Sequence, residues 1–151
     1  DLNMPPLDGF TRTNPICYYH YKMFNESWPV VRQRIVHISA RHHNIDGEVV
    51  EYAAVRLASR PERRKIIFSL SDGEPFSGQD GTTNAMIQNL HQVCARVRQA
   101  GIEVYGFGIG TDEPKKLYGP KWFIYLDQVE KMEADVIKNF CKILTNGMVR
   151  L

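Results

Sequence analysis

The spacing of apolar positions changes several times along this chain, and each change predicts a different element. Residues 65–71, KIIFSLS, form a nearly continuous apolar run, which is typical of a strand buried on both faces of a parallel sheet. Residues 102–110, IEVYGFGIG, and 121–126, KWFIYL, are predicted to be two further strands. The aromatic stretch 16–22, ICYYHYK, has the composition of a short strand and is expected to be a fourth.

Four other segments, 26–43, 45–60, 82–101 and 127–147, carry apolar residues at helical spacing. Because Asp127 is followed by Glu130, the last helix is expected to begin at a capping box. The predicted buried stripes, in order, are Val31, Ile35 and Ile38; Val50, Ala53, Ala54 and Leu57; Met86, Ile87, Leu90, Cys94 and Val97; and Val129, Met132, Val136, Ile137, Phe140, Ile143 and Leu144.

Alternating strands and helices predict an α/β fold, in which a mostly parallel sheet is flanked by helices in three layers. Residues 1–15 hold three prolines and one glycine and are expected to be an extended arm or the end of a strand, and residues 16–151 the domain itself. In such sheets, binding sites form beyond the carboxyl ends of the strands.

The composition of the chain excludes some classes of binding partner. The chain has 151 residues with 19 basic and 17 acidic side chains, a balance that gives no electrostatic reason to expect nucleic acid or a membrane surface as a partner. No apolar run approaches the ~18 residues of a membrane-spanning helix. Cys17, Cys94 and Cys141 are scattered and odd in number, which favours reduced thiols in a cytoplasmic protein, with a role as small core residues.

An acidic turn, Ser71-Asp72-Gly73-Glu74, follows the most apolar strand. Asp72 has two interpretations there: a turn or helix cap, or an oxygen ligand for a hard cation such as Mg²⁺ or Mn²⁺. Asn44 and Asp46 precede the second helix and could reach the same sheet edge, although either could also be its N-cap. Asn44, Asp46 and Asp72 together would offer the oxygen ligands that hard cations require.

The segment NIDGEVVEYAAVRLASRPERRKIIFSLSDGEP, residues 44–75, strongly resembles the von Willebrand factor A (VWA) domain at the C-terminus of the CobT subunit of aerobic cobaltochelatase. The matching motifs are N-x-D-G-E at the helix start, an R-P-E-x-R link and S-D-G-x-P after the strand. Weaker matches upstream and downstream extend the ordered resemblance to residues 7–145. The resemblance implies a Rossmann-like VWA fold with a metal-ion-dependent adhesion site that takes ligands from three loops.

One of those three loops has no counterpart, because D-x-S-x-S occurs nowhere in the sequence. The residues available for a partial site are Asp72, Asn44 and Asp46, so Mg²⁺ binding is expected to be weak or absent. The strand that carries D-x-S-x-S is central in the family. We therefore expect the strand at 65–71 to lack a neighbour, which an upstream segment or a companion chain would supply.

By the resemblance, the domain is a non-catalytic, metal-dependent protein-binding module that works with an AAA+ ATPase and a large chelatase-type subunit in cobalt insertion into a corrin. Gly73, Glu74 and His43 are expected at the partner-facing surface. Two alternatives stay open. One is a structural or interaction protein with a vestigial metal site in another ATPase-driven process, and the other is a Rossmann-like hydrolase, for which no nucleophile, base or phosphate loop is readable.

Two further motifs are given simpler interpretations. The glycines of GFGIG, 106–110, lack nucleotide-loop spacing and run into Thr111–Pro114 rather than a helix, so we expect them to let the strand pass close under a helix. The basic stretch RPERRK, 60–65, is interpreted as a solvated link.

Overall fold

The structure is a computed structural model that describes residues 16–39, 43–71, 73–75, 82–126 and 132–146. Its centre is a three-stranded parallel sheet in the order β1-β2-β3. The strands are β1 (Lys65–Ser71), β2 (Ile102–Ile109) and β3 (Phe123–Leu126).

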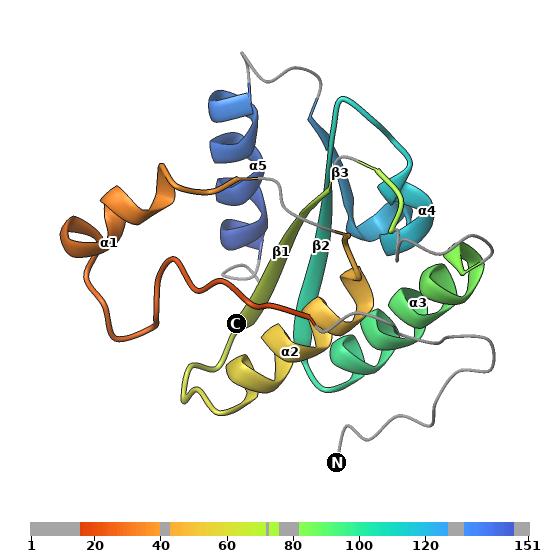
Figure 1. Cartoon of the computed structure of the whole chain (residues 1–151), viewed down its shortest axis with the longest axis horizontal. Coiled ribbons are helices and arrows are strands. Elements are labelled where there is room, and N and C mark those ends of the chain that lie inside the picture. The colour runs from red at the N-terminus through yellow and green to blue at the C-terminus, as the bar shows by residue number, and fades with distance from the viewer. Residues whose placement is uncertain (1–15, 40–42, 72, 76–81, 127–131, 147–151) are drawn as a thin grey trace.

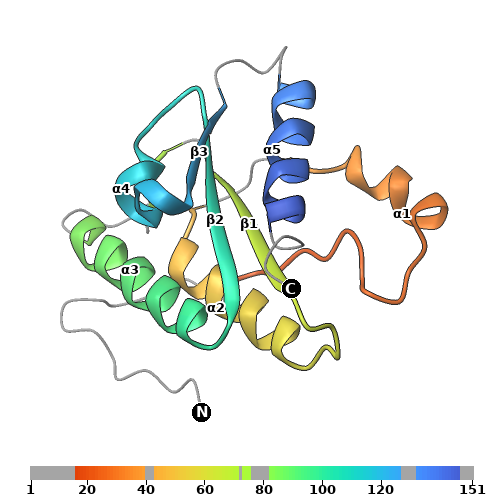
Figure 2. The same cartoon turned by 180° about the vertical axis from the view of Figure 1, so that it is seen from behind.

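Helices cover both faces of this sheet (Figure 1). On one face lie α2 (Asp46–Ala58) and α3 (Thr83–Gln99), and on the other lies α5 (Met132–Asn146). The view from behind shows the same two layers, with α4 (Pro114–Tyr118) beside the carboxyl ends of the strands (Figure 2). The predicted α/β architecture, a parallel sheet flanked by helices, is therefore confirmed.

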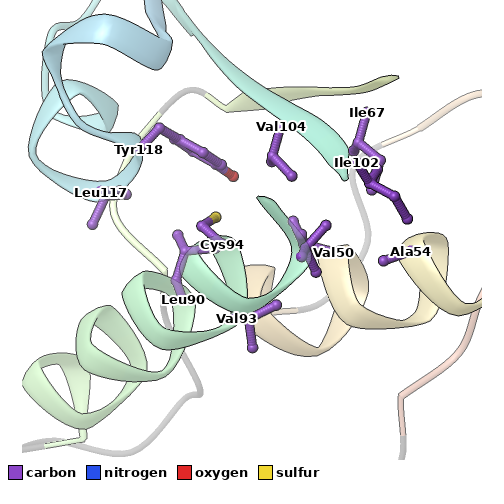
Figure 3. Close-up of a cluster of buried hydrophobic side chains, with 11 residues drawn as sticks. Val50, Ala54, Ile67, Leu90, Val93, Cys94, Ile102, Val104, Leu117 and Tyr118 are labelled. Atoms are coloured by element: carbon purple, nitrogen blue, oxygen red, sulfur yellow. The ribbon is translucent and has the colours of Figure 1, made fainter. Parts of the chain in front are cut away.

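The larger core lies between the sheet and the α2–α3 layer (Figure 3). Leu90 and Val93 of α3 and Val104 of β2 have no exposed surface, and Val50 of α2 is 2% exposed. Burial of each such side chain contributes about 1.5–3 kcal/mol. The apolar stripes predicted for the second and third helices are confirmed, because their members either are buried here or pack against the buried residues.

The smaller core lies on the opposite face, where Phe107 of β2 and Leu126 of β3 are completely buried under α5. Phe68 of β1 stacks on Phe140 of α5 with ring centroids 4.2 Å apart. Phe140 belongs to the predicted stripe of the last helix. Ile137 and Leu144 of the same stripe are exposed, however, so the buried face is narrower than predicted. The predicted helix start at Asp127 lies outside the described residues.

Gly106 explains why α4 can lie against β2. A Cβ atom at Gly106 would come within 2.1 Å of the ring of Tyr118, a side chain that is 1% exposed. The prediction that these glycines let the strand pass close under a helix is confirmed for Gly106, whereas a Cβ at Gly108 would meet Thr111 and Phe123 instead of a helix and one at Gly110 would meet nothing within 4 Å. The accompanying statement that no helix follows is wrong, because α4 begins at Pro114 and a single 3-10 turn, η1 (Pro120–Trp122), follows it.

The predictions for the N-terminal third need correction. Residues 16–22 form no strand, and Tyr18 instead stacks on Tyr52 of α2 with centroids 3.9 Å apart. The first helix, α1 (Trp28–Ile35), is shorter than predicted, and Ile38 lies beyond it with 59% of its surface exposed. These aromatic and apolar residues pack singly on a helix surface, whereas a strand requires a hydrogen-bonded neighbour.

Two more predictions are partly wrong. Cys94 is buried in the core as predicted, but Cys17 and Cys141 are exposed. In β1, Leu70 is 52% exposed, so that strand is not buried on both faces along its whole length. Within the described part of the chain β1 pairs only with β2. A further strand beside β1 stays a prediction.

Candidate functional site at the carboxyl edge of the sheet

The approach to α2 and the loop after β1 meet at the carboxyl edge of the sheet. The Asn44 side chain donates a hydrogen bond from Nδ2 to the backbone carbonyl of Glu74, at 3.3 Å. Asn44 lies two residues before Asp46, where α2 begins, and Glu74 follows β1, which ends at Ser71. The predicted convergence of these two segments is therefore present in the structure.

Ser71 shapes the turn at the end of β1. Its hydroxyl donates to the backbone carbonyl of Gly73 at 2.9 Å and lies 3.4 Å from the Gly73 amide nitrogen, which donates back to it. Ser71 is only 8% exposed, so this contact is sheltered from water and defines the path of the chain past the strand end. The serine thus has a structural role, and nothing in its surroundings indicates a nucleophile.

Asp46 lies in the first turn of α2 and is half-buried. Its negative charge reaches two buried groups of the core. Burial raises the pKa of Tyr118 well above its usual value, and the Asp46 charge raises it further. Burial likewise raises the pKa of the Cys94 thiol to about 11, and the Asp46 charge contributes in the same direction. Asp46 therefore lies at the carboxyl edge and acts through its charge on Tyr118 and Cys94, two residues of the larger core.

Tyr118 completes the layer beneath the edge. Its hydroxyl donates to Ser69 Oγ of β1 at 2.8 Å. A buried tyrosine hydroxyl destabilises the folded state unless it has a hydrogen-bonding partner. The contact fixes α4 on the sheet directly below the loop that carries Gly73.

The rim of this edge is charged. Glu74 is exposed, and Lys116 of α4 forms an ion pair with Glu113 at 3.1 Å. The hydrogen bond to Glu113 raises the pKa of Lys116, and the charges of Glu74 and Asp112 raise it further. Three carboxylates thus act on one lysine, and the rim is acidic overall.

The structure places the predicted site residues as follows. Asn44, Asp46, Gly73 and Glu74 lie together at the carboxyl edge, and His43 is an exposed neighbour of Asn44 in the chain. Asp72 lies outside the described residues, so its distance from the others stays untested.

The fit to a hard cation is partial. Asn44 and Asp46 supply oxygen atoms of the type that Mg²⁺ prefers. In the described ranges, however, no group of three or more histidine, cysteine, aspartate or glutamate side chains could hold a metal ion. The donor type fits Mg²⁺, and the number of described donors does not reach a complete site.

The sequence did not predict a role at this edge for Ser69, Ser71 or Tyr118. A serine at either position of S-L-S has no local signal for turn formation, and Tyr118 lies 49 residues from its partner Ser69. One signal was available for Tyr118. Gly106 is a strand glycine with no turn to serve, and such a glycine often marks the close approach of another group.

This arrangement, a parallel sheet with helices on both faces and acidic and amide side chains at the carboxyl ends of its strands, defines a Rossmann-like α/β fold of the VWA class. The particular family follows from comparison with known proteins. The family described as "Cobalamin biosynthesis protein CobT VWA domain" matches residues 8–146, and the chain belongs to that family.

The curated relatives that match the chain carry a different name from the family, NorD instead of CobT. Protein NorD of Brucella abortus (strain 2308) is 27% identical over 103 residues, which cover 68% of this chain and 16% of NorD. Protein NorD of Brucella suis biovar 1 is 25% identical over the same length. The chain therefore spans about a sixth of the length of these relatives.

No solved structure matches the chain. None of the helices in the described ranges has both the length and the apolar character needed to cross a bilayer.

Proposed function

We propose that this domain is a protein-binding module that acts with an AAA+ ATPase and docks through the carboxyl edge of its sheet. The observation that carries the proposal is the Asn44–Glu74 hydrogen bond, since it joins two segments of the family motif into one surface. Gly73 and Glu74 form the centre of the docking surface, with His43 beside them. The exposure of Glu74 and His43 and the acidic rim suit a partner that presents a basic or metal-bridged group.

We further propose that the surface takes Mg²⁺ or Mn²⁺ with Asn44, Asp46 and Asp72 as its protein ligands. The hard oxygen donors of Asn44 and Asp46 support this choice over a transition metal. When bound, the ion would supply an open coordination position for a carboxylate of the partner. With so few protein ligands the affinity is expected to be weak.

The process is proposed from the family. The CobT name points to cobalt insertion into a corrin, with the AAA+ ATPase and a large chelatase-type subunit as partners in the cytoplasm. Because the curated relatives carry a different name, NorD, we propose a wider definition, in which the module serves an ATPase–VWA pair whose target need not be a corrin. We therefore propose an AAA+ ATPase as the partner and do not make cobalt insertion a part of the proposal.

Binding to the AAA+ ATPase of the same cell tests the docking surface. The purified ATPase would be titrated with this domain in its full parent chain, carrying either Glu74→Lys or Glu62→Lys. Both glutamates are exposed, but Glu62 lies before β1, at the opposite end of that strand. We expect Glu74→Lys to weaken binding roughly tenfold, about 1.4 kcal/mol, and Glu62→Lys to leave it unchanged. Equal effects of the two variants would place the contact elsewhere.

Calorimetric titration with Mg²⁺ and with Mn²⁺ tests the metal separately. Asp72→Ala and Asp46→Asn should each abolish the binding heat, and Asp112→Asn, which changes an acid of the same rim, should leave it unchanged. If all variants retain the heat of the native chain, the ligand assignment is wrong, while the docking surface remains open to the first test.

The absence of a readable nucleophile, base or phosphate loop leads us to propose that the chain has no catalytic activity alone. ATP hydrolysis and ester hydrolysis by the purified domain are expected to stay at background. Reproducible turnover that a single substitution abolishes would favour the hydrolase alternative.

A further inference from the structure

Exposed large apolar side chains are concentrated in one part of the molecule. The described residues include 14 of them, and eight lie between residues 18 and 38. Tyr19, Trp28 and Val30 are 56%, 57% and 66% exposed. A gathering of this kind on a protein surface marks an interaction site, whereas single exposed apolar residues need no explanation.

The segment that carries these side chains is anchored on α2. Tyr18 stacks on Tyr52 with an interplanar angle of 16°, and His20 Nε2 lies 2.9 Å from the Tyr52 hydroxyl. Arg56, one turn further along α2, contacts the His20 ring and donates to Met23 Sδ at 3.4 Å. The stretch from Tyr18 to Phe24 therefore has α2 behind it, which limits the conformational entropy that a partner must remove on binding there.

Two arginines lie among these rings. The guanidinium of Arg56 is 5.5 Å from the centroid of the Phe24 ring, and that of Arg60 is 5.1 Å from the same centroid. Phe24 itself is 49% exposed. A guanidinium held over an aromatic ring keeps its planar N–H groups available to a carboxylate, so this pairing can bind apolar and acidic groups side by side.

The charge of this region is positive. Five cations lie in the segment, contact it or flank it: Lys22, Arg32, Arg34, Arg56 and Arg60. The two acids beside them are each already paired, Glu26 with Arg34 at 2.8 Å and Glu62 with Arg60 at 2.7 Å. Within the described part of the chain, Lys22, Arg32 and Arg56 form no ion pair with a carboxylate, although the charge of Lys22 acts on Glu26. This region therefore holds five cations against two acids, a local excess of positive charge in a chain whose formal net charge is +2.

We propose that this aromatic–arginine surface, formed by Tyr18, Phe24, Arg56 and Arg60 and continued along the chain by the exposed Tyr19 and Trp28, binds an acidic protein segment that carries aromatic or aliphatic anchors. The exposed rings would take the anchors, and the arginines with Lys22 would pair with flanking carboxylates. Aromatic residues and arginine are the residue types that most often dominate binding energy at protein interfaces.

The charge pattern favours an acidic protein over a nucleic acid. Nucleic-acid affinity comes chiefly from many phosphate contacts, and two of the five cations here are already paired with acids, Arg34 with Glu26 and Arg60 with Glu62. The surface is also distinct from the carboxyl edge. Arg56 is in the last turn of α2 and Arg60 follows its end, whereas Asn44 and Asp46 lie at its start. The two docking proposals can therefore succeed or fail independently.

Fluorescence anisotropy with labelled peptides tests this surface. The probe is a glutamate-rich peptide with tryptophan and leucine anchors, compared with a peptide in which glutamine replaces every glutamate and with one in which serine replaces every anchor. We expect only the acidic, anchored peptide to bind, and its affinity to fall as salt is added. A single-stranded DNA oligonucleotide provides the comparison with a nucleic acid.

Variants in matched pairs locate the binding. Trp28→Ala and Arg56→Gln are expected to weaken binding roughly tenfold each. Tyr125→Ala removes an aromatic that is 47% exposed on β3, and Lys121→Gln removes a cation that lies 5.4 Å from the Trp122 ring. Both control variants should bind like the native chain. Circular dichroism of each variant checks that the fold is retained.

Several outcomes would overturn the proposal. These are no binding at the highest soluble peptide concentration, equal binding of the acidic and glutamine peptides, and equal losses in the surface and control variants. Tighter binding of the DNA oligonucleotide would assign the surface to a nucleic acid. A concentration-dependent dimer in sedimentation that Trp28→Ala dissociates would assign it to a second copy of this chain.

Discussion

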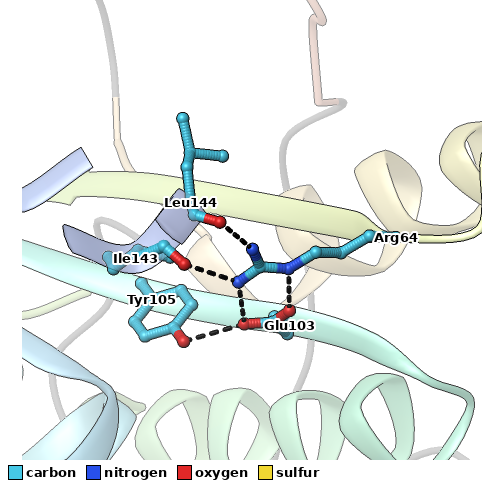
Figure 4. A network of polar contacts seen from close by, with 5 residues as sticks. All are labelled: Arg64, Glu103, Tyr105, Ile143 and Leu144. Atoms are coloured by element: carbon cyan, nitrogen blue, oxygen red, sulfur yellow. Dashed lines mark hydrogen bonds and ion pairs between the residues drawn. The ribbon is translucent and has the colours of Figure 1, made fainter. Parts of the chain in front are cut away.

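The two ends of the central sheet are built differently. At the amino end, the Arg64 side chain joins three elements (Figure 4). Arg64 Nε and Nη2 donate to the two carboxylate oxygens of Glu103 on β2, at 2.6 and 3.1 Å. The same guanidinium donates to the backbone carbonyls of Ile143 and Leu144 in the last turn of α5, at 2.7 and 2.8 Å. Tyr105 adds a hydrogen bond to Glu103 at 2.8 Å.

The carboxyl end has no comparable network in the described residues. A 3.3 Å amide contact from Asn44 joins the approach to α2 to the loop after β1, and the ion pair Lys116–Glu113 has a lysine side chain that is 74% exposed. Glu74 and Lys116 at this end are exposed, whereas Arg64, Glu103 and Tyr105 at the amino end bond to one another.

This contrast separates stability from function. A helix leaves its last carbonyl groups without intrahelical partners, and Arg64 supplies the missing donors for α5. Its bidentate pair with Glu103 is of the strong, directional kind. The amino end therefore holds the layers together, and the carboxyl end is the edge at which we propose that a partner docks.

The largest effect is expected where the packed interior reaches the carboxyl end. Gly106→Ala would place Cβ within 2.1 Å of the buried Tyr118 ring and should lower the free energy of unfolding by about 3 kcal/mol. Gly73→Ala meets no atom within 4 Å and should change it by less than about 0.5 kcal/mol. Urea unfolding of both variants measures the difference. Equal losses would show that the loop after β1 is as tightly packed as the strand.

Breaking the amino-end network comes next. Arg64→Ala should lower the free energy of unfolding by about 2 kcal/mol, because Glu103 and two carbonyls lose charged hydrogen-bond donors. Lys116→Ala, which removes the exposed ion pair of the other end, should cost less than about 0.5 kcal/mol. Hydrogen exchange of α5 should rise in Arg64→Ala alone. Similar values for the two variants would remove the contrast between the ends.

The same network predicts a pH dependence. The hydrogen bonds from Arg64 lower the pKa of Glu103 below its ordinary value of 4.5. A lowered pKa in the folded state contributes stability that is present above pH 4.5 and is lost as the pH falls through the folded-state pKa. Glu103→Gln should therefore cost about 1–2 kcal/mol near neutral pH and progressively less in acid. Urea midpoints measured from neutral pH downward check this, and a constant difference would contradict it.

The smallest effect is expected beneath the carboxyl edge. Tyr118→Phe removes the 2.8 Å hydrogen bond to Ser69 without changing the packing of the ring, and should cost about 1 kcal/mol. Tyr125→Phe alters an exposed ring and should have no measurable effect. Thermal unfolding of the two variants measures the difference. An unchanged Tyr118→Phe would mean that this contact does not fix α4 on the sheet.

The elements with strong local periodicity were predictable from the sequence. The apolar run at 65–71 and the helix that places Leu90 and Cys94 in the core were both confirmed. Residues 16–22 were not, because an aromatic-rich stretch has the same composition whether it pairs in a sheet or packs on a helix. Only the position of Tyr52 decided between the two.

The candidate site was predictable in part. The motif identified Asn44, Asp46 and the turn after β1, and the structure brings Asn44 to Glu74 across 30 residues of chain. No pattern indicated Ser71 or Tyr118, because a hydroxyl acquires its role from the neighbour that folding supplies.

By itself the sequence determined the alternation of strands and helices, their buried stripes and the family motif, because each depends on the spacing or order of residues close together in the chain. Only the tertiary structure decided the role of Arg64, which the sequence indicated as a solvated link. Its partners lie 39, 79 and 80 residues away. Such contacts depend on how the packed layers position the backbone. The residues next to an arginine in the sequence therefore do not predict them.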